Sequence, residues 1–361
     1  MRPVVWSTPP DPPPFPASGY ADLAESFARI LNTTNDLLLI QGEAMVALEA
    51  AAASLGAPGR RALNLVTSLY GRWFGAWLRR AGVEVVDLLA EPGKPLAAEL
   101  VEEALKRGRF DILVVVHAES ASGILNPLEA VAALAKAHGA LLVVDAVASV
   151  GGHELDLTAL GADLVAVGPQ KALGGQAGVS ALAVSPAAWA KIAPSGEAPS
   201  ILSLADQRAL WLEQGRGALP GTPSALEFHA LAGSLARVEA EGLAALRDRH
   251  RRAASAARAG VLALTGRAWV PPAQASNLVT AAALPEGISV AALLAVAPPE
   301  HALTAGVGPG AERLIRLNHT GPRARLETVL EDLAALAHGL RALGLPADAG
   351  AALAAAREAS S

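Results

Sequence analysis

Apolar runs and amphipathic segments alternate along the first half of the chain. The runs are apolar throughout rather than at every second position, which is typical of strands buried on both faces of a sheet. They predict strands at residues 37–40, 62–66, 83–88, 111–116, 140–145, 162–168 and 179–184. The segments between them carry apolar residues every three or four positions and predict helices at residues 43–55, 71–82, 97–108 and 126–139. This alternation predicts an α/β fold with a mostly parallel sheet sandwiched by helices.

The pattern changes from about Asp206 onward, where longer helical segments replace the alternation. Helices are predicted at residues 227–242, 246–264 and 323–343, and strands at residues 276–284 and 313–318. We therefore expect a proline-rich arm (1–20), a large domain (21–235), a smaller α+β C-terminal domain (236–345) and an alanine-rich tail (346–361). The tail is predicted to be frayed helix or disorder.

Composition limits the class of protein. With 361 residues, of which 52% are apolar and 17% charged, the chain can bury a large core and is too poor in charge to be disordered. The net charge of -5 comes without any basic run interleaved with aromatics, so we expect no nucleic-acid partner and favour a small-molecule one. No cysteine is present, which excludes disulfides, thiolate metal sites and a cysteine nucleophile.

Targeting and catalytic motifs are equally sparse. The start "MRPVVWSTPPDPPPFP" is too rich in proline for a signal peptide, and no uncharged apolar run is long enough for a bilayer. We expect a soluble, cytoplasmic protein with no membrane partner. The eight histidines are scattered without ligand spacing, so no metal site is expected. A serine hydrolase is disfavoured because the chain has no G-x-S-x-G motif.

Polar residues follow several of the predicted strands. In an open parallel sheet, ligands bind beyond the carboxyl ends of the strands, so these residues are expected to share one edge. They are Glu43, Tyr70, His117, Glu119, Ser120, Asp145 and Lys171. The segment after the lysine is rich in glycine, which would let backbone or a flat ligand approach closely.

Asp145 and Lys171 allow two interpretations. A carboxylate at the end of a buried strand needs a cation or several hydrogen-bond donors, and the following "AVASVGG" supplies no cation. The two side chains could form a simple ion pair between neighbouring strand ends. Alternatively, a pyridoxal ring could lie between them, with the lysine holding the aldehyde as a Schiff base and the acid keeping the pyridine nitrogen protonated. The residues alone leave both readings open.

The remaining strand-end residues also have structural readings. Tyr70 could stack on a ring or only pack, and His117 is better explained as a structural histidine than as a catalytic base. Ser120 could simply begin the turn "ESASGILNP", in which Asn126 is the expected N-cap of the next helix and Pro127 its first residue.

Several motifs together identify a family resemblance. The pieces "GEAMVALEAAAASL", "SLYGRWFG", "HAESASGILNP", "VVDAVASVGG", "GPQKALGG", "GTPS" and "RLIRLNHTG" resemble class V aminotransferases of pyridoxal-phosphate fold type I. The resemblance covers most of the chain. It implies an aminotransferase with a large domain, a smaller C-terminal domain and a homodimeric active unit whose active site lies at the subunit interface.

The resemblance also implies roles for individual residues. Lys171 would be the Schiff-base lysine and proton carrier, and Asp145 would pair with the pyridine nitrogen. Tyr70 would stack on the ring, and Ser120 would reach the ring hydroxyl. Arg316 in "RLIRLN" would grip the substrate carboxylate, a bidentate task suited to a planar guanidinium.

Further positions concern the cofactor phosphate. Thr222 in "GTPS" would reach the phosphate bound by the neighbouring subunit. Glu43 and Ala44 stand in the loop and helix start that bind phosphate in relatives, and a glutamate there resembles the pyridoxamine-pyruvate type of the family, which takes the free vitamin as substrate. Gln170 is more like the phosphate-using members. The expected cofactor is therefore pyridoxal 5'-phosphate, or unphosphorylated pyridoxal or pyridoxamine bound as substrate.

We accordingly expect a transaminase most like the pyridoxamine-pyruvate type, acting on a small-molecule amino donor and a 2-oxo acid. The alternative is a phosphate-dependent alanine-glyoxylate or serine-glyoxylate type, and a second alternative is a non-catalytic pyridoxal-binding scaffold. Two departures from the family pattern leave the amino acceptor open and favour the scaffold alternative: an early glycine-proline segment is missing, and Val307 stands where a second substrate-binding arginine is expected.

Overall fold

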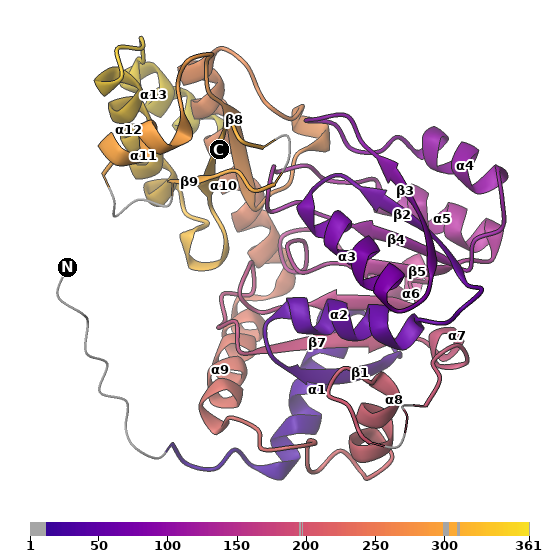
Figure 1. Ribbon diagram of the computed structural model, residues 1–361. Coiled ribbons are helices and arrows are strands. Elements are labelled where there is room, and N and C mark those ends of the chain that lie inside the picture. The colour runs from indigo at the N-terminus through magenta and orange to yellow at the C-terminus, as the bar shows by residue number, and fades with distance from the viewer. Residues whose placement is uncertain (1–11, 195, 197, 299–302, 309–310, 361) are drawn as a thin grey trace.

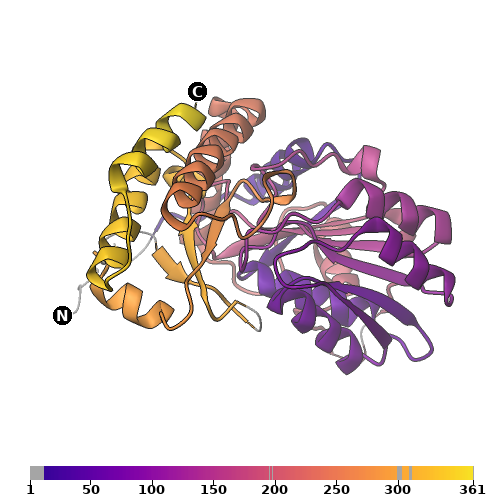
Figure 2. The same ribbon diagram turned by 90° about the horizontal axis from the view of Figure 1, so that it is seen from above.

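The chain folds into two lobes, a larger one built on a central sheet and a smaller one toward the C-terminus (Figure 1). The structure, a computed structural model, describes residues 12–194, 196, 198–298, 303–308 and 311–360. Seen from above, the smaller lobe lies beside one end of the sheet and its long helices run along the outside (Figure 2).

The central sheet contains every strand predicted for the first half of the chain. Its strands are β1 (Asp36–Gln41), β2 (Arg61–Val66), β3 (Glu84–Leu89), β4 (Ile112–Val116), β5 (Leu141–Asp145), β6 (Leu164–Val167) and β7 (Val179–Val184), in the order β1-β7-β6-β5-β4-β2-β3. The pairs from β3 through β6 are parallel, whereas β7 runs antiparallel to both of its neighbours. The predicted α/β architecture is thus confirmed.

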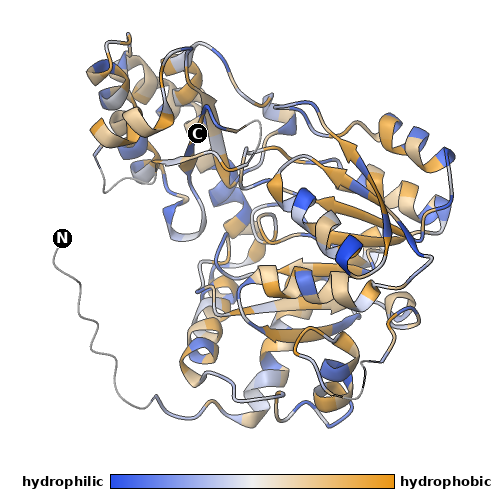
Figure 3. Ribbon diagram, viewed as in Figure 1, coloured by the Kyte–Doolittle hydropathy of each residue, from blue (hydrophilic) through white to orange (hydrophobic). Residues whose placement is uncertain are grey.

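Burial explains why the strands are apolar throughout. Strands β4, β6 and β7 are buried at every position, and the sheet forms the apolar centre of the larger lobe (Figure 3). Strand β3 is mostly exposed because it forms the edge of the sheet. The parallel register sets the end of β4 at Val116 level with Asp145, so the residues that follow these strands emerge at the same edge.

Helices cover both faces of the sheet. They are α1 (Ala17–Leu31), α2 (Ala44–Leu55), α3 (Leu69–Arg80), α4 (Ala98–Lys106), α5 (Leu128–His138), α6 (Leu157–Leu160), α7 (Pro186–Trp189), α8 (Leu204–Gln207), the π-helix η1 (Arg208–Leu212) and α9 (Ala225–Glu241). The connection from β2 to β3 moves toward one edge of the sheet, whereas the connections from β3 to β4 and from β4 to β5 move toward the other edge. Because such parallel crossovers are right-handed, α3 lies on the face opposite to α4 and α5. Helices α2 and α3 pack against each other on that face (Figure 1).

Helix α1 begins at Ala17, within the predicted proline-rich arm (1–20), and Tyr20 is buried against Phe228 with their rings 4.9 Å apart. The boundary of the arm stays a prediction. The predicted N-cap of α5 is wrong. Asn126 does not cap α5, whose cap is Pro127. The buried side-chain amide of Asn126 instead donates to the Val116 carbonyl at 2.8 Å, which ties the end of β4 to the following loop.

The smaller lobe has its own core and sheet. Strands β8 (Val279–Ala283), β9 (Leu303–Ala305) and β10 (Leu314–Asn318) pair antiparallel in the order β8-β10-β9. Around them lie α10 (Leu243–Thr265), η2 (Pro272–Gln274), α11 (Val290–Val296), η3 (Gly321–Arg323), α12 (Leu326–Ala342) and α13 (Ala349–Ala359). This is the predicted α+β arrangement. The predicted boundary at residues 235 and 236 falls inside α9, and the domain limits stay a prediction.

The alanine-rich tail is not frayed. It forms α13, which packs along α10 with Ala352 and Ala356 fully buried. Small side chains let the two helix backbones approach closely, and this packing replaces the stability that an isolated short helix lacks. Among the described residues, no helix is both long and apolar enough to cross a membrane.

Candidate active site

A cavity of about 290 Å³ opens at the carboxyl edge of the central sheet. The predicted site residues that line it are Glu43, Ala44, Tyr70, Ser120, Asp145 and Lys171. Apolar residues complete the wall: Met45, Leu48, Trp73, Val116, Ala118, Val147 and Ala148. The parallel strands therefore bring together side chains that lie more than a hundred residues apart in sequence.

Asp145 presents a buried carboxylate to this cavity. It ends β5 and accepts a hydrogen bond from the Val147 backbone N–H at 3.0 Å. Burial raises the pKa of the Asp145 carboxyl to about 6, and the charge of Glu43 makes a smaller contribution in the same direction. A positively charged ring nitrogen placed against the carboxylate would stabilise the ionised form.

Lys171 lies on the loop that follows β6 and is not paired with Asp145. Among the described residues its amine makes no ion pair within 4 Å, so the simple ion-pair interpretation is not what the structure has. Burial lowers the pKa of the lysine, the charge of Arg316 lowers it further, and the nearby carboxylates of Glu43 and Asp145 partly oppose the shift. A lowered pKa increases the neutral, nucleophilic fraction of the amine.

Two aromatic side chains form one wall of the cavity. Tyr70 lies in the first turn of α3, where the Ser68 hydroxyl caps the helix by accepting from the Tyr70 N–H at 3.1 Å. Trp73, one turn later, meets Tyr70 edge to face with ring centres 5.8 Å apart. Sequence reasoning did not select Trp73, although its position three residues after Tyr70 on a helix was the available signal.

Glu43 is the N-cap of α2. One carboxylate oxygen accepts from the Met45 N–H at 2.8 Å, and the other accepts from the Gln170 side-chain amide at 2.7 Å. The oxygen of the same Gln170 amide is buried and accepts no hydrogen bond from the part of the chain that the structure describes. The N-terminus of α2, where an anion would ordinarily be attracted, thus already holds a carboxylate of the protein itself.

Glu119 is a buried carboxyl that the strand-end pattern indicated without assigning it a role. It accepts short hydrogen bonds from the hydroxyls of Thr67 and Ser68, which lie at the end of β2 and the start of α3. Burial raises the pKa of Glu119 to about 7, against the opposing effect of these two hydrogen bonds. Glu119 therefore positions the turn that carries Ser120 against the helix start that carries Tyr70.

Arg316 reaches the site from the smaller lobe. It lies on β10, and its guanidinium donates to the Ala305 carbonyl at 2.8 Å and to the Ser120 carbonyl at 2.5 Å. It does not line the cavity directly, but its charge lowers the pKa of Lys171. Burial lowers the pKa of the guanidinium itself, and the nearby Tyr70 partly opposes that shift. The guanidinium thus joins the two lobes beside the cavity.

Two other residues lie outside the cavity. Thr222 is exposed on a surface loop and does not line it. His117 is buried beside His153, with ring centres 5.7 Å apart, and burial lowers its pKa to about 4. Its neutral, enclosed ring agrees with the structural reading. Among the described residues, no cluster of three or more potential metal ligands is present.

The cavity fits a flat pyridine-type cofactor. A tyrosine ring forms a wall, and the same cavity holds a buried acid and an amine of lowered pKa that make no ion pair with any residue the structure describes. Fold and site together define a pyridoxal-dependent transferase of fold type I. The profile of the family described as aminotransferase class-V matches residues 17–296, and the chain belongs to this family. Pyridoxal phosphate is the cofactor that the family implies.

Several characterised proteins resemble the chain over nearly its whole length. The pyridoxamine-pyruvate transaminase of Mesorhizobium japonicum is 33% identical over 331 residues, which cover 90% of this chain and 84% of that protein. The alanine-glyoxylate aminotransferase of Callithrix jacchus is 30% identical over 315 residues, covering 85% of this chain and 76% of that protein.

Solved structures show the same fold. The pyridoxamine-pyruvate aminotransferase from Mesorhizobium loti matches with a TM-score of 0.89 at 32% identity, covering 95% of this chain and 88% of that one. The ureidoglycine-glyoxylate aminotransferase from Bacillus subtilis matches with a TM-score of 0.86 at 25% identity, covering 98% and 92%.

Proposed function

We propose that the protein transfers the amino group of pyridoxamine to pyruvate, which yields pyridoxal and L-alanine. The observation that carries the proposal is Glu43 at the N-terminus of α2, where it occupies the donors of Met45 and Gln170. A phosphate ester placed there would face a negative charge, whereas the hydroxymethyl group of the free vitamin could donate a hydrogen bond to the same carboxylate. The similarity to a pyridoxamine-pyruvate transaminase supports the same substrate pair.

The side chains around the cavity suit this chemistry. When bound, the pyridoxal ring would accept the electron pair that stays behind when a proton leaves the substrate carbon. Lys171 would hold the aldehyde covalently and carry that proton on Nζ, which its lowered pKa favours. Asp145 would hold the ring nitrogen, because an ionised carboxylate in a buried place needs a cationic partner.

The remaining roles concern orientation. Tyr70 would cover the ring, and the Ser120 hydroxyl would bond the ring hydroxyl. Arg316 would hold the pyruvate carboxylate, and its two carbonyl partners already fix the direction of its guanidinium. With Val307 in place of a second arginine, this single guanidinium would carry the recognition of the carboxylate.

A phosphate-dependent alanine-glyoxylate or serine-glyoxylate activity is the second candidate. Gln170 favours it, since this residue resembles the phosphate-using members of the family, and an alanine-glyoxylate aminotransferase is among the relatives. A non-catalytic scaffold is less favoured because the lysine, acid and tyrosine all reach one cavity.

The active unit would be a homodimer. Thr222 lies outside the cavity of its own chain and is exposed, so it would be available to a neighbouring subunit. Trp73 supports the same arrangement, because this large side chain at the cavity wall is 40% exposed in the single chain. The cytoplasmic location stays a prediction.

The test is an absorbance spectrum of the purified protein followed by mass analysis of the released chromophore. We expect a chromophore with the mass of pyridoxal or pyridoxamine, and formation of alanine when pyridoxamine and pyruvate are supplied. Release of pyridoxal phosphate, with turnover of alanine and glyoxylate only, would favour the second candidate. Absence of any turnover with both pairs would contradict both activities.

A further inference from the structure

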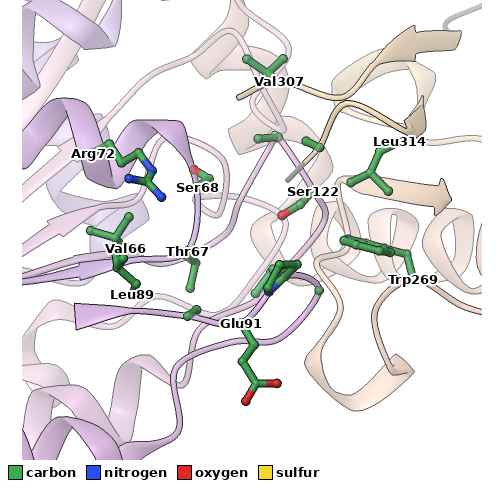
Figure 4. Close-up of a pocket in the computed structure, with 16 residues that line it drawn as sticks. Val66, Thr67, Ser68, Arg72, Leu89, Glu91, Ser122, Trp269, Val307 and Leu314 are labelled. Carbon is green, nitrogen blue, oxygen red and sulfur yellow. The ribbon is translucent and has the colours of Figure 1, made fainter. Parts of the chain in front are cut away.

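A second cavity, of about 300 Å³, lies between the two lobes on the other side of the segment that carries Tyr70. The larger lobe contributes Ser68, Arg72 and Ser122, and the smaller lobe contributes Trp269, Val307 and Leu314 (Figure 4). In that view Arg72 and Trp269 enter from opposite sides, and the Ser122 hydroxyl points into the space between them.

Two buried hydrogen-bond donors of this cavity lack a partner among the described residues. They are the Ser122 hydroxyl, in a residue that is only 6% exposed, and the indole N–H of Trp269. A buried donor left without a partner is costly, so these two donors indicate a ligand that supplies the acceptor. Arg72 also lines the cavity but is exposed, and within the described part of the chain its guanidinium makes neither an ion pair nor a side-chain hydrogen bond.

The charge of the cavity is positive. Among the described residues that line it, Glu91 is the one with a carboxylate, and its oxygen is paired with Lys94 at 2.6 Å. In Figure 4 this carboxylate points away from Arg72. The Ser68 hydroxyl is already committed to Glu119. Arg72 therefore faces the space without a compensating anion, and an acceptor that is itself negative fits it best.

The rest of the wall is apolar. Leu89, Ile124, Val307, Leu314 and the face of Trp269 surround the donors. The indole packs closely against Gly93, which has φ +78°. A Cβ at this position would lie 3.4 Å from the indole Cε2. A side chain at position 93 would strain this turn and crowd the ring. The cavity thus suits an apolar body that carries an acidic group.

This cavity is adjacent to the catalytic one. Ser122 follows Ser120, whose carbonyl accepts from Arg316, and Leu314 lies two residues before Arg316 on the same face of β10. Gly308, with φ +84°, packs on Leu69 and so holds the Val307 loop against the start of α3. The shorter side chain of Val307 leaves space where an arginine would extend.

We propose that this cavity binds the carboxylate of a small organic acid with an apolar body, through Arg72, Ser122 and the indole N–H of Trp269. The acid has two possible sources that share this chemistry. It is either the distal group of a 2-oxo acid substrate whose first carboxylate lies on Arg316, or a separate monocarboxylate. The first source keeps the transamination and the role of Arg316 from the proposed function but replaces pyruvate with a longer 2-oxo acid, and the second source is independent of the proposed function.

The test is isothermal titration calorimetry of the intact protein with benzoate and with 2-oxoglutarate. We expect saturable binding of at least one probe. Arg72→Gln should weaken it about tenfold or more, because a charge-assisted hydrogen bond is lost. Trp269→Phe keeps an aromatic ring, though a smaller one, and removes the N–H, and Ser122→Ala removes the hydroxyl, so each should weaken binding about threefold to tenfold. Arg80→Gln, on the same helix and paired with Glu49, is the matched control and should leave binding unchanged.

The source of the acid follows from Arg316→Gln. If the acid is the distal group of a substrate, binding of 2-oxoglutarate should weaken in both the Arg72 and the Arg316 variants. If it is a separate monocarboxylate, benzoate binding should weaken in the Arg72 variant and stay unchanged in the Arg316 variant, and benzoate should bind together with pyruvate. Unchanged thermal unfolding of the variants excludes misfolding as the cause.

The proposal is overturned if neither probe binds saturably, or if the Arg72, Ser122 and Trp269 variants bind as the wild type does. Either result leaves alanine formation from pyruvate, and hence the proposed function, untouched. Conversely, loss of benzoate binding in Arg72→Gln would support the cavity even if no transamination of pyruvate were found.

Discussion

Replacing Glu43 with glutamine removes a negative charge from the N-terminus of α2 while keeping a side-chain oxygen that can cap the helix. In the wild type this carboxylate accepts from the Met45 N–H at 2.8 Å and from the Gln170 amide at 2.7 Å. We expect the substitution to change which form of the vitamin the protein prefers, with little effect on folding.

The magnitude follows from the charges. At a separation of about 4 Å and an effective dielectric constant of about 20, each pair of like unit charges costs about 4 kcal/mol. The helix N-terminus favours an anion and offsets about 1 kcal/mol of this cost. Counting a single such pair, the wild type should therefore bind the phosphate ester at least about a hundredfold less tightly than free pyridoxal, and Glu43→Gln should remove most of that difference.

The assay is an absorbance titration of the protein with pyridoxal and with pyridoxal phosphate at fixed ionic strength. Glu43→Ala should also remove the discrimination but lower the free energy of unfolding by about 1 kcal/mol, because the helix cap is lost. Glu49→Gln, farther along α2 and paired with Arg80, is the control for removing a charge elsewhere on the helix. The reasoning is refuted if the wild type holds the phosphate ester as tightly as the free vitamin.

Four further substitutions test the other roles. Lys171→Ala should abolish turnover and leave thermal unfolding unchanged, and borohydride reduction of the ligand-loaded wild type should label Lys171; a label on another lysine would contradict the assignment. Asp145→Asn should slow the chemical step by several kcal/mol, measured in single turnover, because the ring nitrogen loses its carboxylate partner; weaker binding with normal turnover would make the acid structural. Arg316→Gln should raise the KM for pyruvate far more than that for pyridoxamine, whereas equal effects would indicate a role in joining the lobes. The pKa of Glu119 is raised from 4.5 to about 7 in the folded protein. Between these two pH values the carboxyl is ionised in the unfolded chain but still protonated in the folded one, so the free energy of unfolding of the wild type should fall by about 3 kcal/mol as the pH rises from 4.5 to 7. Urea unfolding of Glu119→Gln from pH 4 to 8 should lack this contribution, and an identical pH profile would exclude it.

The arrangement of the larger lobe could be predicted because it depends on local patterns. Uninterrupted apolar runs separated by helices indicate strands buried on both faces, and parallel strands place their carboxyl ends at one edge. Asp145, Lys171 and Tyr70 could therefore be expected in one place before any distance was known. The antiparallel direction of β7 carries no such local signal, since a buried strand is equally apolar in either direction.

Other features depend on partners that lie far away in the chain. Whether Asn126 caps a helix or bonds the end of β4 is decided by which donors and acceptors are buried beside it. The alanine-rich tail has low helical stability by itself, and only the surface of α10 makes α13 a packed helix. Burial, rather than sequence position, sets the raised pKa of Glu119. Arg72 and Trp269 face one cavity because the two lobes meet there, and no spacing along the chain encodes that meeting: polar groups find their partners only after apolar burial has brought distant segments into contact.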